Sequence, residues 1–124
     1  MGAPVAWFEV TSTDHERAQK FYGELFGWTI TVDPDLSGYG IVDTGAGEAT
    51  VGGEAAVGGG IGPSRVPGDT GVKIYLKVDD LEAYLTRAEQ LGGQRVGEPI
   101  ELSGDAGTIA IFTDPDGNPV GLWK

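Results

Sequence analysis

The sequence is poor in the residues that carry metal, redox and nucleic-acid chemistry. It has no cysteine, one histidine, and 8 lysine and arginine residues against 19 aspartate and glutamate residues. Without cysteine there is no disulfide, no thiolate nucleophile and no cysteine-ligated metal. The net charge of −11 argues against a nucleic-acid partner, because phosphates are bound by clustered Lys and Arg.

The chain also lacks segments that would direct it to a membrane. It has no apolar run of about 18 residues, and residues 1–4 show no basic or apolar leader. We therefore expect no membrane partner and a cytoplasmic protein. We interpret the negative charge as a solvated acidic surface, which favours neutral or cationic ligands over anionic ones.

One pattern occurs twice along the chain. Residues 8–27 read as a strand, an acidic cap, an amphipathic helix and a glycine stop, and residues 74–93 repeat this order. Asp80 lies 66 positions after Asp14. Each half then continues with short apolar runs broken by Gly, Pro and Asp. The repeat predicts two β-α-β-β-β modules.

The 124 residues are enough for one domain and too few for two. We predict an α+β fold in which module one spans about 4–63, a linker spans 64–70 and module two spans about 71–124. Each helix covers one face of a sheet. The predicted strands are 4–11, 28–32, 39–43, 48–51, 57–61, 72–78, 94–102, 108–113 and 119–123.

Capping patterns place the two predicted helices. Thr13 to Glu16 has the spacing of a capping box, so Thr13 is expected to cap the first helix, which ends at Gly27. Asp79 is expected to cap the second helix, over 81–91. The apolar stripe expected to face the sheet from the first helix is Ala18, Phe21, Tyr22 and Leu25.

Alternation along the strands predicts which side chains face away from the helices. Phe8 and Val10 are expected under the first helix, which sends Trp7 and Glu9 to the opposite face. Ile74, Leu76 and Val78 are expected under the second helix, and Val120 and Leu122 in the core. The candidate ligand-binding residues on the opposite face are Trp7, Glu9, Tyr39, Lys73, Tyr75 and Trp123.

Aromatic walls with a few polar groups suit a flat organic ligand. The alternative is that these aromatic side chains simply fill the interior or an interface. Glu9 is expected to form an ion pair, for which Lys73 is a candidate, or to contact a ligand; proton transfer is the other reading. The eight glycines of 45–62 precede no helix, so we interpret them as structural and not as a phosphate loop.

Four motifs carry a family resemblance: Asp14 to Ala18 after Glu9, Phe21-Tyr22 with Phe26-Gly27-Trp28, Val78-Asp79-Asp80 with Gly92-Gly93, and Asp114-Pro115-Asp116-Gly117-Asn118. Over nearly its whole length the chain resembles the vicinal oxygen chelate superfamily, which includes glyoxalases, bleomycin-resistance proteins and extradiol dioxygenases. The resemblance implies paired βαβββ modules that form a U-shaped mixed sheet with a central cleft. It also implies a homodimer, because members of the superfamily commonly dimerise.

The resemblance implies three metal-ligand positions, which in this sequence do not hold metal-binding side chains. They fall at Trp7, Lys73 and Gly121, and none of these side chains is a usable ligand at neutral pH. The only histidine, His15, lies in the cap of the first helix and is expected to be exposed. We therefore expect no metal and no other cofactor.

These observations favour a metal-free small-molecule-binding protein. It would sequester a hydrophobic, neutral or cationic compound, as the antibiotic-resistance members do. The alternative is a glyoxalase-like enzyme (a lyase, isomerase or dioxygenase), either metal-independent with Glu9 or Tyr75 in proton transfer, or metal-dependent through other ligands. A third reading is a filled cleft in a domain that serves association only.

Overall fold

The structure is a computed structural model that describes residues 2–45, 56–65 and 71–124. The chain divides into two compact units, one formed by Trp7–Val72 and the other by Met1–Ala6 with Lys73–Lys124. Along the chain the elements follow the order β-α-β-β-β twice, with a short 3-10 helix added in the first half. This confirms the predicted α+β class and its repeat. The predicted strand at 48–51 lies outside the described residues.

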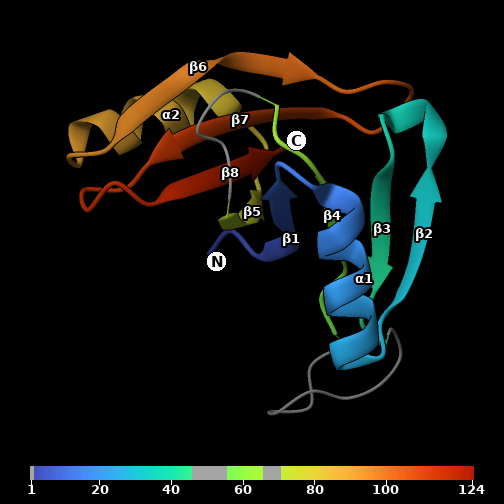
Figure 1. Ribbon diagram of the computed structural model, residues 1–124. Coiled ribbons are helices and arrows are strands. Elements are labelled where there is room, and N and C mark those ends of the chain that lie inside the picture. The colour runs from blue at the N-terminus through green and yellow to red at the C-terminus, as the bar shows by residue number, and fades with distance from the viewer. Residues whose placement is uncertain (1, 46–55, 66–70) are drawn as a thin grey trace. The chain divides into compact units, whose positions relative to one another are not determined.

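The Trp7–Val72 unit is a sheet with one helix against it (Figure 1). Its elements are β1 (Val5–Ser12), α1 (His15–Phe26), β2 (Thr29–Asp33), η1 (Pro34–Leu36), β3 (Tyr39–Asp43) and β4 (Gly59–Pro63). The strands lie in the order β2-β3-β4-β1, with β4 and β1 parallel and the other neighbours antiparallel. The core between α1 and the sheet is formed by Val10, Val42 and Ile61, with Phe8, Ala18, Tyr22, Trp28 and Ile30 packed around them.

The other unit repeats this plan. Its elements are β5 (Gly71–Lys77), α2 (Leu81–Gln90), β6 (Gln94–Glu101), β7 (Thr108–Thr113) and β8 (Pro119–Trp123). The strands follow the order β5-β8-β7-β6, and α2 lies against β6 and β7 (Figure 1). Ala3 packs onto this core, and the Lys77 amide donates to the Pro4 carbonyl. The buried core residues are Val78, Leu81, Leu85, Ala110 and Leu122.

Both helices are capped by the aspartate pair that marks the repeat. Asp14 Oδ1 accepts from the Arg17 amide and Asp80 Oδ1 from the Ala83 amide, each at 3.1 Å. The predicted caps, Thr13 and Asp79, were therefore wrong by one residue. An aspartate carboxylate caps at least as well as a threonine hydroxyl, and its charge also favours the helix N-terminus. Gly27 ends α1 with φ 68°, as predicted.

The apolar stripe predicted for α1 is only half correct. Ala18 and Tyr22 face the sheet, but Phe21 and Leu25 are 57% and 59% exposed. Gln19 is buried in their place, because its Nε2 donates to the carbonyls of Gly38 and Ile61 at 2.9 and 2.8 Å. These two hydrogen bonds fix the rotation of the helix about its axis.

A second packing prediction also needs correction. Ile74 was expected under α2 together with Leu76 and Val78, but its side chain is 42% exposed. Leu76 packs against the α2 core cluster and Val78 belongs to it, whereas Ile74 is outside that cluster. The alternation correctly places Leu76 and Val78 on the side of α2, but α2 covers only the end of β5 and leaves Ile74 exposed.

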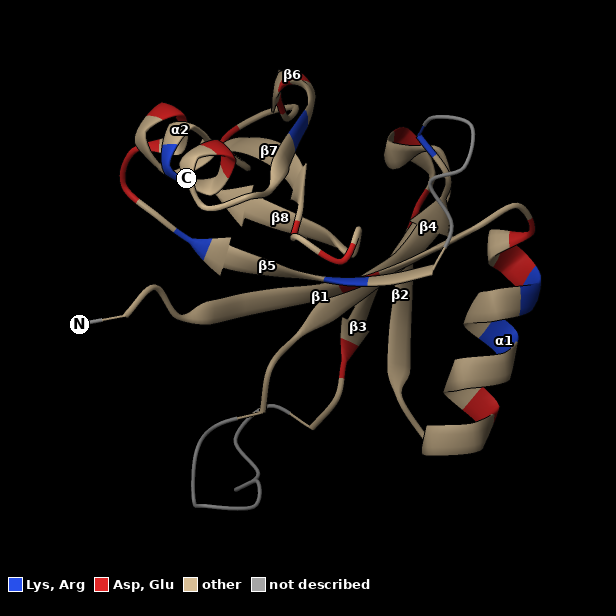
Figure 2. Ribbon diagram, turned by 90° about the vertical axis from the view of Figure 1, so that its left-hand side faces the viewer, with Lys and Arg blue, Asp and Glu red and all other residues tan. Residues whose placement is uncertain are grey.

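Acidic residues lie on both helices and on the connecting turns (Figure 2). The helix positions Glu16, Glu24, Glu82 and Glu89 are all exposed. This distribution agrees with the interpretation of the charge as a solvated surface. Neither of the two helices in the described part has the length and apolar character needed to cross a bilayer.

The cap assignment can be tested on neighbouring aspartates. Asp80→Ala removes the carboxylate that accepts from the Ala83 amide, so it should lower the free energy of unfolding by about 1 kcal/mol. Asp79→Ala is the matched control and should change it much less. Urea denaturation measures both, and an equal loss in the two variants would contradict the assignment.

Candidate functional site

A polar network lies on the face of β1 that points away from α1. Val10 is in the core under α1, so Trp7 and Glu9 face the other side of the sheet. Tyr39 comes to the same side from the start of β3, and Arg65 follows the end of β4. All four side chains belong to the Trp7–Val72 unit.

Hydrogen bonds join these four side chains in one chain of contacts. Trp7 Nε1 donates to Tyr39 Oη at 3.1 Å, and Tyr39 Oη donates to Glu9 Oε2 at 2.9 Å. Arg65 donates to both carboxylate oxygens of Glu9, from Nη1 at 2.8 Å and from Nη2 at 3.0 Å. The Glu9 side chain is 2% exposed and that of Arg65 is 34% exposed. The arrangement is a bidentate ion pair with a buried acid.

The glycines of β4 make room for this network. Tyr39 lies flat along the strand, and a Cβ at Gly60 or Gly62 would overlap its ring. On the opposite face a Cβ at Gly59 would overlap the Phe8 ring. The structural interpretation of these glycines is therefore supported by the close approach of aromatic rings to the strand.

Tyr39 is a hydrogen-bond donor in this site. Burial of its phenol, and next the negative charge of Glu9, raise the pKa of Tyr39 well above its usual range. The phenol therefore stays protonated at neutral pH, where it can donate to Glu9 and accept from Trp7. It is poorly suited to act as a base.

Sequence reasoning missed Arg65, which was assigned to the linker. A buried carboxylate requires a nearby cation, and Arg65 is the cation that contacts Glu9 in its own unit. The signal was present, because Glu9 alternates with core residues and Arg65 closely follows β4. Pairing of Glu9 with Lys73 stays a prediction.

The remaining three candidate residues belong to the other unit. Lys73 and Tyr75 are buried, and Tyr75 packs flat against Gly121, its partner in the β5–β8 register. Trp123 Nε1 donates to the Ala106 carbonyl at 2.7 Å, and Lys77 Nζ lies 4.1 Å from the Trp123 ring centroid. The structure thus brings Trp7, Glu9 and Tyr39 together, while the cleft shared by the two modules stays a prediction.

The side chains of the buried network do not fit a divalent metal. Such a site needs about three converging oxygen or nitrogen donors, and the described residues hold no group of three His, Cys, Asp or Glu so placed. Both oxygens of Glu9 already accept from Arg65. His15 is partly buried instead of exposed as expected, with its ring beside Gly38.

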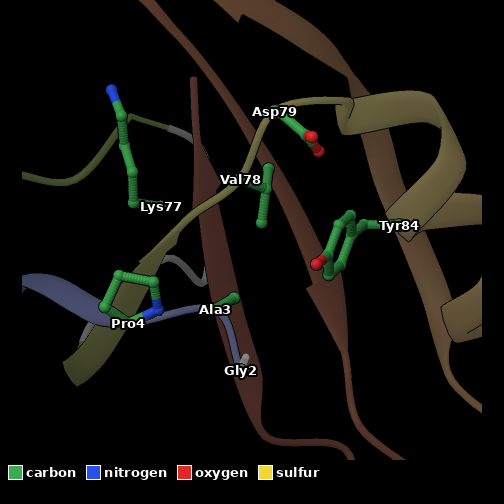
Figure 3. Close-up of a pocket in the computed structure, with 7 residues that line it drawn as sticks. All are labelled: Gly2, Ala3, Pro4, Lys77, Val78, Asp79 and Tyr84. Carbon is green, nitrogen blue, oxygen red and sulfur yellow. The ribbon is translucent and has the colours of Figure 1, made fainter.

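A separate hollow of about 370 Å³ lies in the other unit (Figure 3). Its walls combine apolar groups with Tyr84 and Asp79, and Lys77 lies at its edge. None of the six candidate ligand-binding residues is among those that line it. The full lining is Gly2, Ala3, Pro4, Lys77, Val78, Asp79 and Tyr84. We give the buried network more weight, because its polar groups are oriented by hydrogen bonds.

Comparison with known proteins agrees with this fold. Residues 7–123 match the family model described as "Glyoxalase-like domain", and the chain belongs to this family. The protein CFP32 of Mycobacterium bovis, provisionally called a glyoxylase, is 34% identical over 95% of this chain and 44% of its own length. The anthracycline biosynthesis protein DnrV of Streptomyces peucetius is 31% identical over 99% of this chain and 47% of its own. The chain therefore spans about half the length of these curated relatives.

Solved structures of other proteins share this fold. A glyoxalase/bleomycin resistance protein/dioxygenase superfamily member from Vibrio splendidus gives a TM-score of 0.58 at 19% identity, covering 98% of this chain and 97% of its own. Methylmalonyl-CoA epimerase from Mycobacterium tuberculosis gives 0.59 at 18% identity, covering 96% and 85%. At this identity the likeness concerns the fold alone.

The glycine contact at Tyr39 yields a stability prediction. Gly60→Ala would displace the Tyr39 ring and should lower the free energy of unfolding by about 1–3 kcal/mol. Gly23→Ala is the control, because Gly23 lies inside α1 and an added Cβ would make only ordinary van der Waals contacts, with Ile30 and Trp28. This variant should add about 0.5–1 kcal/mol. Thermal and urea unfolding measure both variants. A neutral Gly60→Ala would contradict the close packing.

The raised pKa of Tyr39 yields a pH prediction. The folded state holds this phenolic proton more tightly than the unfolded state, so the contribution is complete below about pH 10 and is lost as the pH rises further. Tyr39→Phe should therefore lose less stability than the wild type above about pH 10. Urea midpoints of both proteins, measured below and above about pH 10, would show this difference in stability. If the stability of the two proteins fell equally as the pH rose above about pH 10, the pKa of Tyr39 would not be raised.

Proposed function

We propose that this chain binds a flat, hydrophobic organic molecule, neutral or cationic, against Trp7 and Tyr39 without the help of a metal. The observation that carries the proposal is the hydrogen-bonded chain from Trp7 through Tyr39 to the buried Glu9–Arg65 pair. It holds two aromatic rings on one face of the sheet, and rigid aromatic rings bind flat ligands at little entropic cost.

Neighbouring groups support the same ligand class. Ile41 follows Tyr39 on the same face of β3 and is 41% exposed, which adds apolar surface beside the rings. The net charge of −11 favours cations over anions. One relative is named for anthracycline biosynthesis, which is consistent with a fused-ring aromatic ligand.

The enzymatic alternative has less support from the geometry. The Glu9 oxygens accept three hydrogen bonds from Arg65 and Tyr39, which leaves little capacity to take a substrate proton. Tyr75, the other candidate for proton transfer, is 3% exposed. The homodimer expected from the family resemblance stays a prediction.

Calorimetric titration with three fused-ring probes tests the proposal: neutral fluorenone, cationic aminoacridine and anionic anthracenesulfonate. The first two should bind and the third should bind more weakly. Trp7→Leu should weaken binding by about two- to tenfold, because an aromatic contact contributes about 0.5–1.5 kcal/mol. Dialysis against a chelator should leave the affinities unchanged.

Tyr84→Leu is the matched control for this test. It removes an exposed aromatic ring from the separate hollow and should leave binding unchanged. Loss of binding in Tyr84→Leu with none in Trp7→Leu would move the site to that hollow. Binding that returns only with a stoichiometric divalent ion would refute the metal-free proposal.

A further inference from the structure

The hollow of about 370 Å³ has an apolar wall and, beside it, an aromatic ring and a carboxylate. Ala3, Pro4 and Val78 form the apolar wall, and Tyr84 and Asp79 complete the lining on the other side (Figure 3). All of these residues belong to the same compact unit. Tyr84 is 42% exposed, and Asp79 is exposed as well. A small molecule can therefore reach both the ring and the carboxylate.

The start of the chain, which forms one wall of the hollow, is held by the rest of its unit. Ala3 packs against the core under α2, and the Lys77 amide donates to the Pro4 carbonyl at 3.0 Å. The Val78 amide donates to the Trp123 carbonyl at 2.9 Å. These contacts attach the apolar wall to β5 and β8, as expected of a site that is formed before its ligand arrives.

Asp79 is not used by the helix cap that its position in the sequence suggests. Its neighbour Asp80 accepts from the Ala83 amide at 3.1 Å and so caps α2. In the part of the chain that the structure describes, the Asp79 carboxylate forms no hydrogen bond or ion pair with another residue. Its negative charge is therefore available to a ligand in the hollow.

Among the described residues that line the hollow, the single cation is turned away from it. Lys77 Nζ lies 4.1 Å from the centroid of the Trp123 ring, and Figure 3 shows the Lys77 side chain extending away from Tyr84. The hollow thus presents a carboxylate beside an aromatic ring. An ammonium group suits this pair, because the carboxylate attracts its charge and the ring face adds a cation–π contact.

We propose that the hollow binds a small organic cation, with its ammonium group between Asp79 and the Tyr84 ring and its alkyl part against the apolar wall. This site is separate from the proposed aromatic surface of the other unit, and it takes a compact alkylammonium compound in place of fused rings. The net charge of −11 favours the approach of cations. Both polar contacts are exposed to solvent, so each is weak and the affinity is expected near the millimolar range.

Choline and dimethylbutanol form the test pair, because they share one shape and differ in a central atom, a charged nitrogen in the first and a neutral carbon in the second. NMR titration of the backbone amides at constant ionic strength measures such weak affinities and locates the site. Choline should shift the amide signals of residues 77–79 and 84. It should bind about three- to thirtyfold tighter than dimethylbutanol, the sum of an exposed ion pair and a cation–π contact.

Two variants with matched controls test the assigned contacts. Asp79→Asn and Tyr84→Leu should each weaken choline binding about two- to fivefold and leave dimethylbutanol binding unchanged. Asp116→Asn removes the same charge from the turn between β7 and β8, outside the hollow, and should leave choline binding unchanged. Tyr84→Phe keeps the ring and should also bind choline as the wild type does.

The remaining outcomes overturn the inference. These are no binding of choline, equal affinities for the two probes, or equal weakening by Asp79→Asn and Asp116→Asn. Choline-induced shifts around Trp7 with none at residues 77–79 and 84 would place the cation on the aromatic surface and would also refute this site. Fluorenone titrations bear on the proposed binding function alone, so either proposal can fail while the other stands.

Discussion

The Trp7–Val72 unit depends on one buried carboxylate. Glu9 lies in the middle of β1 with 2% of its side chain exposed, and an unpaired charge there would cost several kcal/mol. Arg65 supplies the counter-charge through two hydrogen bonds, and Tyr39 adds a third. Because Arg65 follows β4 and Tyr39 begins β3, this requirement ties three strands together at one point.

The second constraint is space, and it explains why β4 is built of glycine. Tyr39 must lie against the strand to reach Glu9, and Phe8 must lie against its other face to reach the core. A side chain at Gly59, Gly60 or Gly62 would block one of these rings. The strand contributes backbone hydrogen bonds, while neighbouring strands supply the aromatic surface on both of its faces.

Much of the fold follows from local rules, and the departures have physical causes. Alternation placed Trp7 and Glu9 on the face opposite Val10, and the capping patterns located both helix starts to within one residue. The rotation of α1 could not be predicted, because it depends on Gln19 bonding to two carbonyls distant in sequence. Arg65 was missed because its partner lies 56 residues away in sequence, although a carboxylate expected among core residues signals that a cation must lie near it.

Membership of the glyoxalase-like family therefore says more about the scaffold than about its chemistry. The first-strand position that the family resemblance assigns to a metal ligand holds Trp7, and the nearby carboxylate is turned to Arg65. An indole at that position presents an aromatic surface and no lone pair for a metal ion. The buried Glu9 carboxylate orients Tyr39, and through it Trp7. An aromatic surface held in place in this way is what the proposed binding of a flat organic molecule requires.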